Sequence, residues 1–360
     1  MTQDWTKEIR SPAARARAPE RPVYRLRREN NARRRNAMTF SCLGKVTGTT
    51  PSTLGFWSGA LERVLHDAWR HRPPTRAPLV IGLAESGIIP SALFHQILRR
   101  RRPGAGWICS TRRPSAGIVF SEHHSHAPDH VLPCPETRPT ELWFVEDEIT
   151  TGRTLLGLSL ELCRRLDQRC VRYIAFTDVR TAKMQQEFGA ILSEYGISFS
   201  LHTIFPGAPE GGAGPESLRL DEPPAPTGRA LDADPAPESA WHFPDCRPAL
   251  RRQFHTDIPL PTGLSGSLLA VGEAVDLGVR MIQCNPGLQL HHITLSPWEV
   301  DDVHIHNRVK IGDAFYLYNL QSLRPPLHIL NDPMDEAVGR AARHTLASMG
   351  FQVRQLMITP

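Results

Sequence analysis

The sequence predicts an α/β protein with a parallel sheet, and two observations support this fold class. Short apolar runs of the kind found in buried strands occur at residues 79–83, 141–145 and 173–176. Segments with a helical spacing of apolar residues, 90–101 and 154–166, lie between them. Strands and helices that alternate in this order form parallel sheets covered by helices on both faces.

Local patterns define these elements. The run Leu79–Leu83 ends in small residues and is followed by a turn at Glu85–Gly87. A further short strand is expected at Trp107–Cys109. The apolar faces of the two expected helices consist of Leu93, Ile97 and Leu98 in the first, and of Leu155, Leu158, Leu162 and Leu166 in the second.

The C-terminal part of the chain shows the same alternation of expected strands and helices, which predicts a second, smaller α/β domain. Here the strands are expected at 268–271, 290–294, 314–318, 327–330 and 351–357, and the helices at 273–284 and 334–349. The segment 206–252, which separates the two parts, is rich in Pro and Gly and has few large aliphatic residues, as is typical of a linker. The expected organisation is therefore a basic tail (1–20), a first domain (21–205), this linker, and a second domain (253–360).

Composition excludes several classes of protein. In the 360 residues no apolar run approaches the length of a membrane span, and no charged and then apolar leader opens the chain. The seven cysteines are scattered and form no C-x-x-C pair, which argues against a disulfide framework or a zinc ribbon. We therefore expect a soluble cytoplasmic protein that makes no membrane contact.

The net charge of +5 comes from one segment. Residues 10–35 contain ten Arg and two Glu, a local excess of +8, so the rest of the chain sums to −3. Such a segment attracts nucleic acid or phosphate-rich ligands. A solvated or locally structured surface is an equally open interpretation.

The residues after the strand expected at 141–145 have the chemistry of a sugar-phosphate site. Glu146 and Asp147 stand at the carboxyl end of this strand, where α/β sheets bind ligands and where carboxylates accept hydrogen bonds from vicinal hydroxyls. The loop 150–154 then leads into a helix whose N-terminal amides favour anions, and Gly152 permits a tight turn. The alternative is an ordinary strand–loop–helix connection with a charged turn.

The stretch Val145-Glu-Asp-Glu-Ile-Thr-Thr-Gly152 resembles the phosphoribosyl pyrophosphate (PRPP) signature of type I phosphoribosyltransferases. The resemblance implies that Glu146 and Asp147 bind the ribose hydroxyls. It also implies that the loop binds the 5′-phosphate through Thr150, Thr151, Gly152, Arg153 and Thr154. Glu148 departs from the wider superfamily, in which this position is usually apolar.

Two further segments fit this resemblance. The residues Glu85, Ser86 and Gly87 follow an earlier strand, where such enzymes hold the pyrophosphate on a small-residue loop; a purely structural turn is the alternative. The segment 109–130 has no convincing secondary-structure pattern and stands where the superfamily has a mobile flap. Its Arg112 and Arg113 suit bidentate recognition of pyrophosphate.

The histidines of the same segment allow a rival interpretation, a transition-metal site. The candidate ligands are Glu122, His123, His124, His126 and His130. No second cluster with standard spacing completes such a site, so we expect no metal centre built from a protein cluster.

Taken together, the segments 31–35, 42–46, 109–130 and 145–152 resemble the phosphoribosyltransferase proteins of bacterial tellurium-resistance (ter) gene clusters, which carry a C-terminal TRSP domain. Lys45 would then line the phosphate site. In the C-terminal part, Thr294-Leu-Ser-Pro297 stands where the name-giving Thr-Arg-Ser-Pro is expected, with leucine in place of arginine. Shorter matches follow at 271–273, 311–313 and 316–319.

The resemblance implies transfer of a 5-phosphoribosyl group from PRPP to a nucleobase-like acceptor, with release of pyrophosphate. Mg²⁺ would be carried by PRPP, with Asp147 as a candidate protein ligand, and a homodimer is compatible with the family. The candidate catalytic residues are Glu146, Asp147, Glu148, Arg112 and Arg113. A PRPP- or nucleotide-binding regulator that contacts nucleic acid is the alternative function, and a metal-dependent hydrolase is a third.

Overall fold

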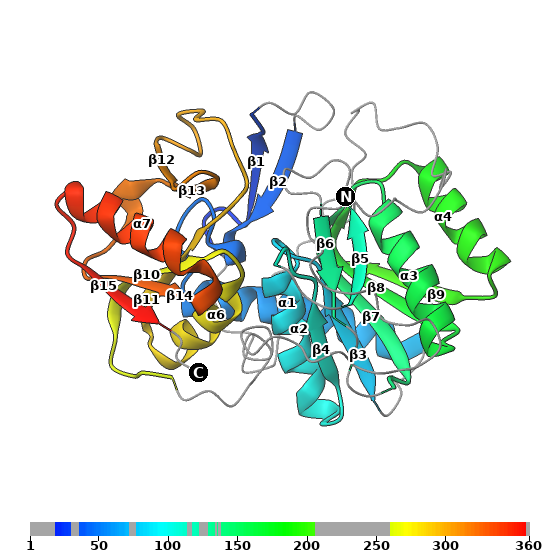
Figure 1. Ribbon diagram of the computed structural model, residues 1–360. Coiled ribbons are helices and arrows are strands. Elements are labelled where there is room, and N and C mark those ends of the chain that lie inside the picture. The colour runs from blue at the N-terminus through cyan, green and yellow to red at the C-terminus, as the bar shows by residue number, and fades with distance from the viewer. Residues whose placement is uncertain are drawn as a thin grey trace.

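The computed structural model has two lobes, each built on a parallel sheet (Figure 1). The α/β class predicted from the sequence is therefore confirmed. The Pro/Gly-rich segment 206–252 and nearly all of the tail 1–20 lie outside the described residues. The structure describes residues 19–29, 36–71, 77–113, 117–121, 129–133, 135, 138–205 and 260–357.

The large lobe contains a five-stranded, all-parallel sheet in the order β4-β3-β7-β8-β9. Its strands are β3 (Pro78–Gly82), β4 (Gly106–Cys109), β7 (Glu141–Ile149), β8 (Cys170–Asp178) and β9 (Ser198–Thr203). The helices are α1 (Pro51–His71), α2 (Ile88–Arg101), α3 (Arg153–Leu166) and α4 (Ala182–Glu194). Side chains alternate between the two faces of a strand, so Val80 packs with α1 and α2, whereas Leu79 and Ile81 pack with α3 and α4.

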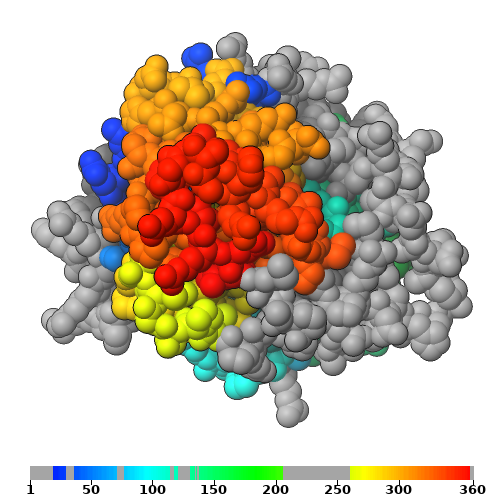
Figure 2. All heavy atoms as spheres, turned by 60° about the vertical axis from the view of Figure 1, so that its left-hand side comes forward, coloured from blue at the N-terminus to red at the C-terminus, as the bar shows by residue number. Residues whose placement is uncertain are grey.

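The small lobe contains a four-stranded parallel sheet in the order β11-β10-β14-β15. Its elements are β10 (Ser265–Val271), α6 (Val275–Cys284), β11 (Gly287–Ile293), the antiparallel pair β12 (Arg308–Ile311) and β13 (Phe315–Tyr318), β14 (Leu327–Asn331), α7 (Glu336–Ser348) and β15 (Val353–Met357). Short 3₁₀ turns, η4 (Gly272–Ala274), η5 (Leu320–Ser322) and η6 (Pro333–Asp335), follow β10, β13 and β14. The helix expected at 273–284 thus starts with a 3₁₀ turn. In Figure 2, α7 and β15 form the outer face of this lobe.

Two sequence predictions need correction. The segment 109–130 is not irregular throughout, because β5 (Ile118–Ser121) and β6 (Asp129–Leu132) pair antiparallel. Strands of four residues are too short to give a clear period in the sequence. In addition, the strand expected at 141–145 continues to Ile149 along β8, so the three acidic residues belong to the strand itself.

A third antiparallel pair bridges the lobes. It consists of β1 (Val23–Arg27) and β2 (Asn36–Phe40), and the 3₁₀ turn η3 (Ser41–Leu43) follows it. Arg28, directly after β1, pairs with Trp298 of the small lobe, and Thr49, between η3 and α1, pairs with Leu290 of β11. The N-terminal part of the chain is thereby held against the C-terminal part.

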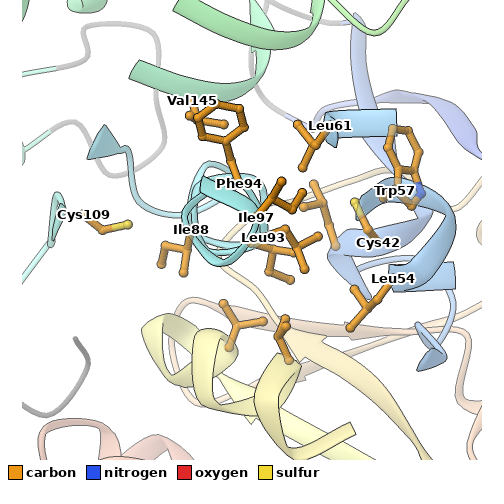
Figure 3. Packing of buried hydrophobic residues seen from close by; sticks show 14 of the residues in the cluster. Cys42, Leu54, Trp57, Leu61, Ile88, Leu93, Phe94, Ile97, Cys109 and Val145 are labelled. Atoms are coloured by element: carbon orange, nitrogen blue, oxygen red, sulfur yellow. The ribbon is translucent and has the colours of Figure 1, made fainter. Parts of the chain in front are cut away.

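The two lobes share one hydrophobic core. A single cluster of buried side chains combines α1 and α2 of the large lobe with α6 and β11 of the small lobe. Helix α2 lies between the large sheet and α6, as Figure 3 shows, with Phe94 directed toward Val145 of β7. The described parts of the lobes are therefore packed together as domain interiors are, rather than simply tethered.

We expect the two lobes to unfold together. Leu93 of α2 is fully buried in the shared core, so Leu93→Ala should lower the free energy of unfolding by about 2–5 kcal/mol. Differential scanning calorimetry should show one transition, shifted as a whole to lower temperature. Leu160→Ala, on a half-buried position of α3, is the control and should cost less. Two transitions, of which Leu93→Ala moves only one, would contradict a shared core.

Candidate functional site

The candidate site is a cleft between the lobes, at the carboxyl ends of strands from both parallel sheets. Ligands bind at this edge of parallel sheets because the loops that follow the strands meet there. The small lobe supplies the turn after β11, and the segment around β1 and β2 closes the cleft. The lining residues are Arg28, Met38, Leu83 to Ser86, Arg112, Glu146 to Gly152, Thr154, Leu155, Ser296 and Trp298.

The three carboxylates at the end of β7 alternate between the two faces of the strand. Asp147 is 8% exposed, and its Oδ1 accepts a hydrogen bond from the Glu148 backbone N–H at 2.9 Å. Glu146 and Glu148, on the other face of the strand, are half-buried. Glu146 Oε1 accepts a hydrogen bond from the Leu83 N–H at 2.9 Å, which ties β7 to the loop after β3. All three acidic residues predicted from the sequence line the cleft.

The loop after β7 has the geometry of an anion site. Gly152 has a φ of 78° and caps α3, and a Cβ added there would lie 3.0 Å from Arg180 Nη1. The positive φ favours glycine here, and the short contact adds crowding to any larger residue. The N–H groups of the first turn of α3 have no partners within the helix and carry partial positive charge. Thr150, Thr151, Gly152 and Thr154 line the cleft, whereas Arg153 does not.

The loop after β3 folds back against Glu146. A Cβ at Gly87 would lie 2.6 Å from Glu146 Oε1 and 2.7 Å from the Leu83 carbonyl oxygen, so the close approach requires glycine. Glu85 and Ser86 line the cleft, but Gly87 does not. It shapes the loop from behind.

Glu85 is buried, and donors from both lobes surround its carboxylate. Its Oε2 lies 3.4 Å from Arg112 Nη1, and its Oε1 lies 3.5 Å from Lys45 Nζ. From the small lobe, the Thr294 hydroxyl and the Leu295 N–H, at 3.1 Å, donate to Oε1. Burial alone would raise the pKa of Glu85, but Lys45, His292, Arg112 and the Thr294 hydroxyl outweigh it and hold the pKa well below its usual range. Glu85 is therefore an ionised anchor between the lobes.

Lys45 lies behind the cleft wall. It is 2% exposed, and burial lowers the pKa of its ammonium group from the usual value although Glu85 and Asp147 oppose this shift. Its Nζ is 2.9 Å from Ser86 Oγ and 3.4 Å from Ser296 Oγ. The expectation that Lys45 lines the site itself is thus corrected: the described geometry places it one layer below, supporting residues that do.

Arg113 does not reach the cleft. Its guanidinium forms ion pairs with Asp332 and Asp335, and its Nε lies 3.7 Å from Glu273 Oε2. Burial would lower the pKa of Arg113, but these three carboxylates raise it above the usual range. Glu273 also accepts hydrogen bonds from the Thr111 hydroxyl at 2.7 Å and the Arg112 N–H at 2.8 Å. Arg113 is thus part of a latch between the end of β4 and the small lobe.

Of the five candidate metal ligands, only His130 lies within the described residues. His123, His124 and His126 lie outside them, as does Glu122. His130 in β6 is buried, its Nδ1 is 3.2 Å from Ser110 Oγ, and burial lowers its pKa to about 3. In the described ranges no group of three or more His, Cys, Asp or Glu is arranged to hold a metal ion.

Comparison with known proteins places this geometry in a family. Residues 24–208, just over half of the chain, match the family model for phosphoribosyl transferases. The chain belongs to the phosphoribosyl transferase family. No curated protein matches it.

Solved structures with a similar course of the chain include an adenine phosphoribosyltransferase. It is 14% identical, with a TM-score of 0.36, and the match covers 51% of this chain and 95% of that one. The Saccharomyces cerevisiae adenine phosphoribosyltransferase, complexed with an imino-altritol bisphosphate and adenine, is 13% identical, with a TM-score of 0.36 and coverages of 51% and 94%. Likenesses at this level carry no argument about the substrate.

Several residues that line the cleft of this phosphoribosyl transferase were not predicted. Arg28 and Met38 come from the segment around β1 and β2, and Ser296 and Trp298 from the small lobe. The sequence contained one signal, the Thr-Leu-Ser-Pro motif at 294–297, but nothing in it indicated contact with residue 85.

Among the described residues no helix is long and apolar enough to cross a bilayer.

Asp276 interacts with Arg113 and Asp332 of the latch, and its ionisation should make the stability of the protein depend on pH. Asp276 is 3% exposed, and burial raises its pKa to about 8, with Arg280 and Arg113 lowering it and Asp332 raising it further. A carboxyl whose pKa is raised in the folded state stabilises the fold at low pH and loses this effect as the pH rises toward 8. Asp276→Asn, which resembles the protonated form, should therefore melt at a higher temperature than wild type at pH 7.5, with a gap that narrows toward pH 4.5.

Thermal melts at pH 4.5, 6 and 7.5 measure this effect. Asp313→Asn, an exposed position in the same lobe, is the control and should follow the wild type throughout. An Asp276→Asn variant that melts lower than wild type at pH 7.5 would mean that Asp276 is ionised and paired in the folded protein.

Proposed function

We propose that this phosphoribosyl transferase moves the 5-phosphoribosyl group of PRPP to a nucleobase-like acceptor and releases pyrophosphate. The observation that carries the proposal is the convergence of the β7 carboxylates, the Thr150–Thr154 loop and the loop after β3 on one cleft. An acidic edge beside an anion-binding helix start suits a ribose 5-phosphate. Membership of the family supports the same reaction.

The proposed roles follow from position. Glu146 and Asp147 bind the ribose hydroxyls, and Thr150, Thr151, Gly152 and Thr154 receive the 5′-phosphate. Arg112, Glu85 and Ser86 form the pyrophosphate side. Departure of pyrophosphate leaves positive charge on the ribose ring, so the reaction needs placed charges more than a nucleophile. Glu148 is the candidate acid or base toward the acceptor, since it also lines the cleft.

Magnesium carried by PRPP fits this wall, where Asp147 is the candidate protein ligand, because a carboxylate offers the oxygen ligands that Mg²⁺ prefers. Bound with PRPP, it would supply neutralisation of the charge on the leaving pyrophosphate. The residues of the chain then hold the ribose and the phosphate and close the cleft to water.

We also propose that the chain is of the ter-cluster type, with a TRSP-like second domain after the linker 206–252. The support is the Thr294–Pro297 motif, which lies at the carboxyl end of β11 and contacts Glu85. In this proposal the second domain is part of the transferase site. The protein acts on small molecules in the cytoplasm.

Asp147→Asn should reduce turnover. Removing the charge weakens hydrogen bonds to the ribose, and kcat/KM should fall about 10- to 100-fold. The assay is release of pyrophosphate from PRPP–Mg with a panel of purine and pyrimidine bases. Asp167→Asn is the control, because Asp167 is exposed and its left-handed backbone also accepts asparagine. No release with any acceptor, together with tight, salt-dependent binding of RNA or DNA, would instead support the regulator.

A further inference from the structure

Three oxygen atoms surround the Lys45 ammonium group, two hydroxyls to which it donates hydrogen bonds and the carboxylate of its ion pair. They are Ser86 Oγ at 2.9 Å, Ser296 Oγ at 3.4 Å and Glu85 Oε1 at 3.5 Å. An ammonium group donates and never accepts. Each serine oxygen therefore receives a hydrogen bond from Lys45, which leaves the serine's own hydrogen to be donated to another group.

Both serines line the cleft, and they come from opposite lobes. Ser86 follows β3 of the large sheet, and Ser296 follows β11 of the small sheet. Both residues are partly exposed, so a ligand in the cleft can reach them. Two hydroxyl donors beside the guanidinium of Arg112 form an arrangement for an anion with several oxygens.

The turn that carries Ser296 is held in place. The Thr294 hydroxyl donates to Glu85 and at the same time accepts the Ser296 N–H at 3.2 Å. The Ser296 carbonyl oxygen accepts a hydrogen bond from the Tyr318 hydroxyl at 2.6 Å. Trp298 stands two residues after Ser296, and its ring centre lies 5.8 Å from Lys45 Nζ. The turn that carries the Ser296 hydroxyl is therefore held in place before a ligand arrives.

The local charge also suits an anion. Lys45, Arg112 and Arg28 carry three positive charges and Glu85 and Asp147 carry two negative charges, so the charged groups around Lys45 keep one net positive charge. His292 lies 3.7 Å from Glu85, and burial lowers its pKa to about 4, so the ring adds no charge at neutral pH. Its Nε2 is 2.9 Å from the Gly272 carbonyl oxygen.

We propose that Ser296, from the small lobe, binds the diphosphate group of the substrate together with Ser86 and Arg112, and that Lys45 and Thr294 are positioning residues for this contact. The proposal rests on the proposed function and adds to it a residue from the second lobe. The small lobe then completes the pyrophosphate subsite, and the large lobe alone forms only part of it.

The test measures the affinity of the full-length protein for Mg–pyrophosphate and for PRPP–Mg by titration calorimetry. Ser296→Ala should weaken pyrophosphate binding about tenfold, the scale of one hydrogen bond to a charged group, and raise KM for PRPP by a similar factor. Ser296→Thr, which keeps a hydroxyl, should retain most of the affinity. Ser348→Ala, on the exposed end of α7, is the matched control and should leave affinity unchanged.

A second pair of variants tests the positioning role. Thr294→Val should weaken pyrophosphate binding, and Thr294→Ser should restore it, with melting temperatures recorded for both to exclude unfolding. Wild-type affinity in Ser296→Ala, with PRPP still bound and turned over, would overturn the diphosphate contact and leave the transferase function standing. If Ser296→Ala weakens pyrophosphate binding but the wild type transfers no phosphoribosyl group to any acceptor, the contact is supported and the transferase function is rejected. A wild type that binds neither pyrophosphate nor PRPP would reject both.

Discussion

The buried carboxylate of Glu85 is the interaction on which the rest of the site depends. A carboxylate in a protein interior is tolerated only when donors and cations compensate for the lost hydration. Here the compensation is divided: Arg112 comes from the large lobe, Lys45 from the segment that bridges the lobes, and the Thr294 hydroxyl and Leu295 N–H from the small lobe. Opening the lobes would strip the carboxylate of half of these donors. The closed arrangement therefore supplies the donors that Glu85 needs in order to be both buried and ionised.

The shared core gives this ion network a rigid base. Every residue of α2 from Ile88 to His95 is buried, although the sequence showed only one apolar face. A helix buried on all sides must be covered by more than one partner, and α2 lies between the large sheet and α6. Even the imidazole of His95 is accommodated, with its Nε2 3.0 Å from the Ala105 carbonyl oxygen. The lobes are thus joined by packing on one side and by charge on the other.

The sequence predicted those parts of the structure that are determined locally. The strand, the glycine turn and the helix start around Gly152 are consecutive in the chain, so their pattern predicted this loop without knowledge of the fold. The local pattern could not predict the partners of Arg112 and Arg113. The side chains of these adjacent residues point in different directions, and the carboxylates that pair with Arg113 come from the small lobe, which is distant in the sequence. The contact of Thr294 with Glu85 spans 209 positions and was equally invisible.

Leu295 stands where the proposed TRSP-like motif would have arginine, and its contacts show what the turn 294–297 contributes. An arginine side chain could bring a charge to the cleft, whereas leucine brings none. Yet the backbone N–H of Leu295 donates to Glu85, and any residue except proline has this donor. The neighbouring Thr294 and Ser296 supply the hydroxyl groups that contact Glu85 and Lys45. The turn 294–297 therefore contributes through its backbone and its two hydroxyls, and the positive charge of this corner comes from Lys45 and Arg112, which lie outside this turn.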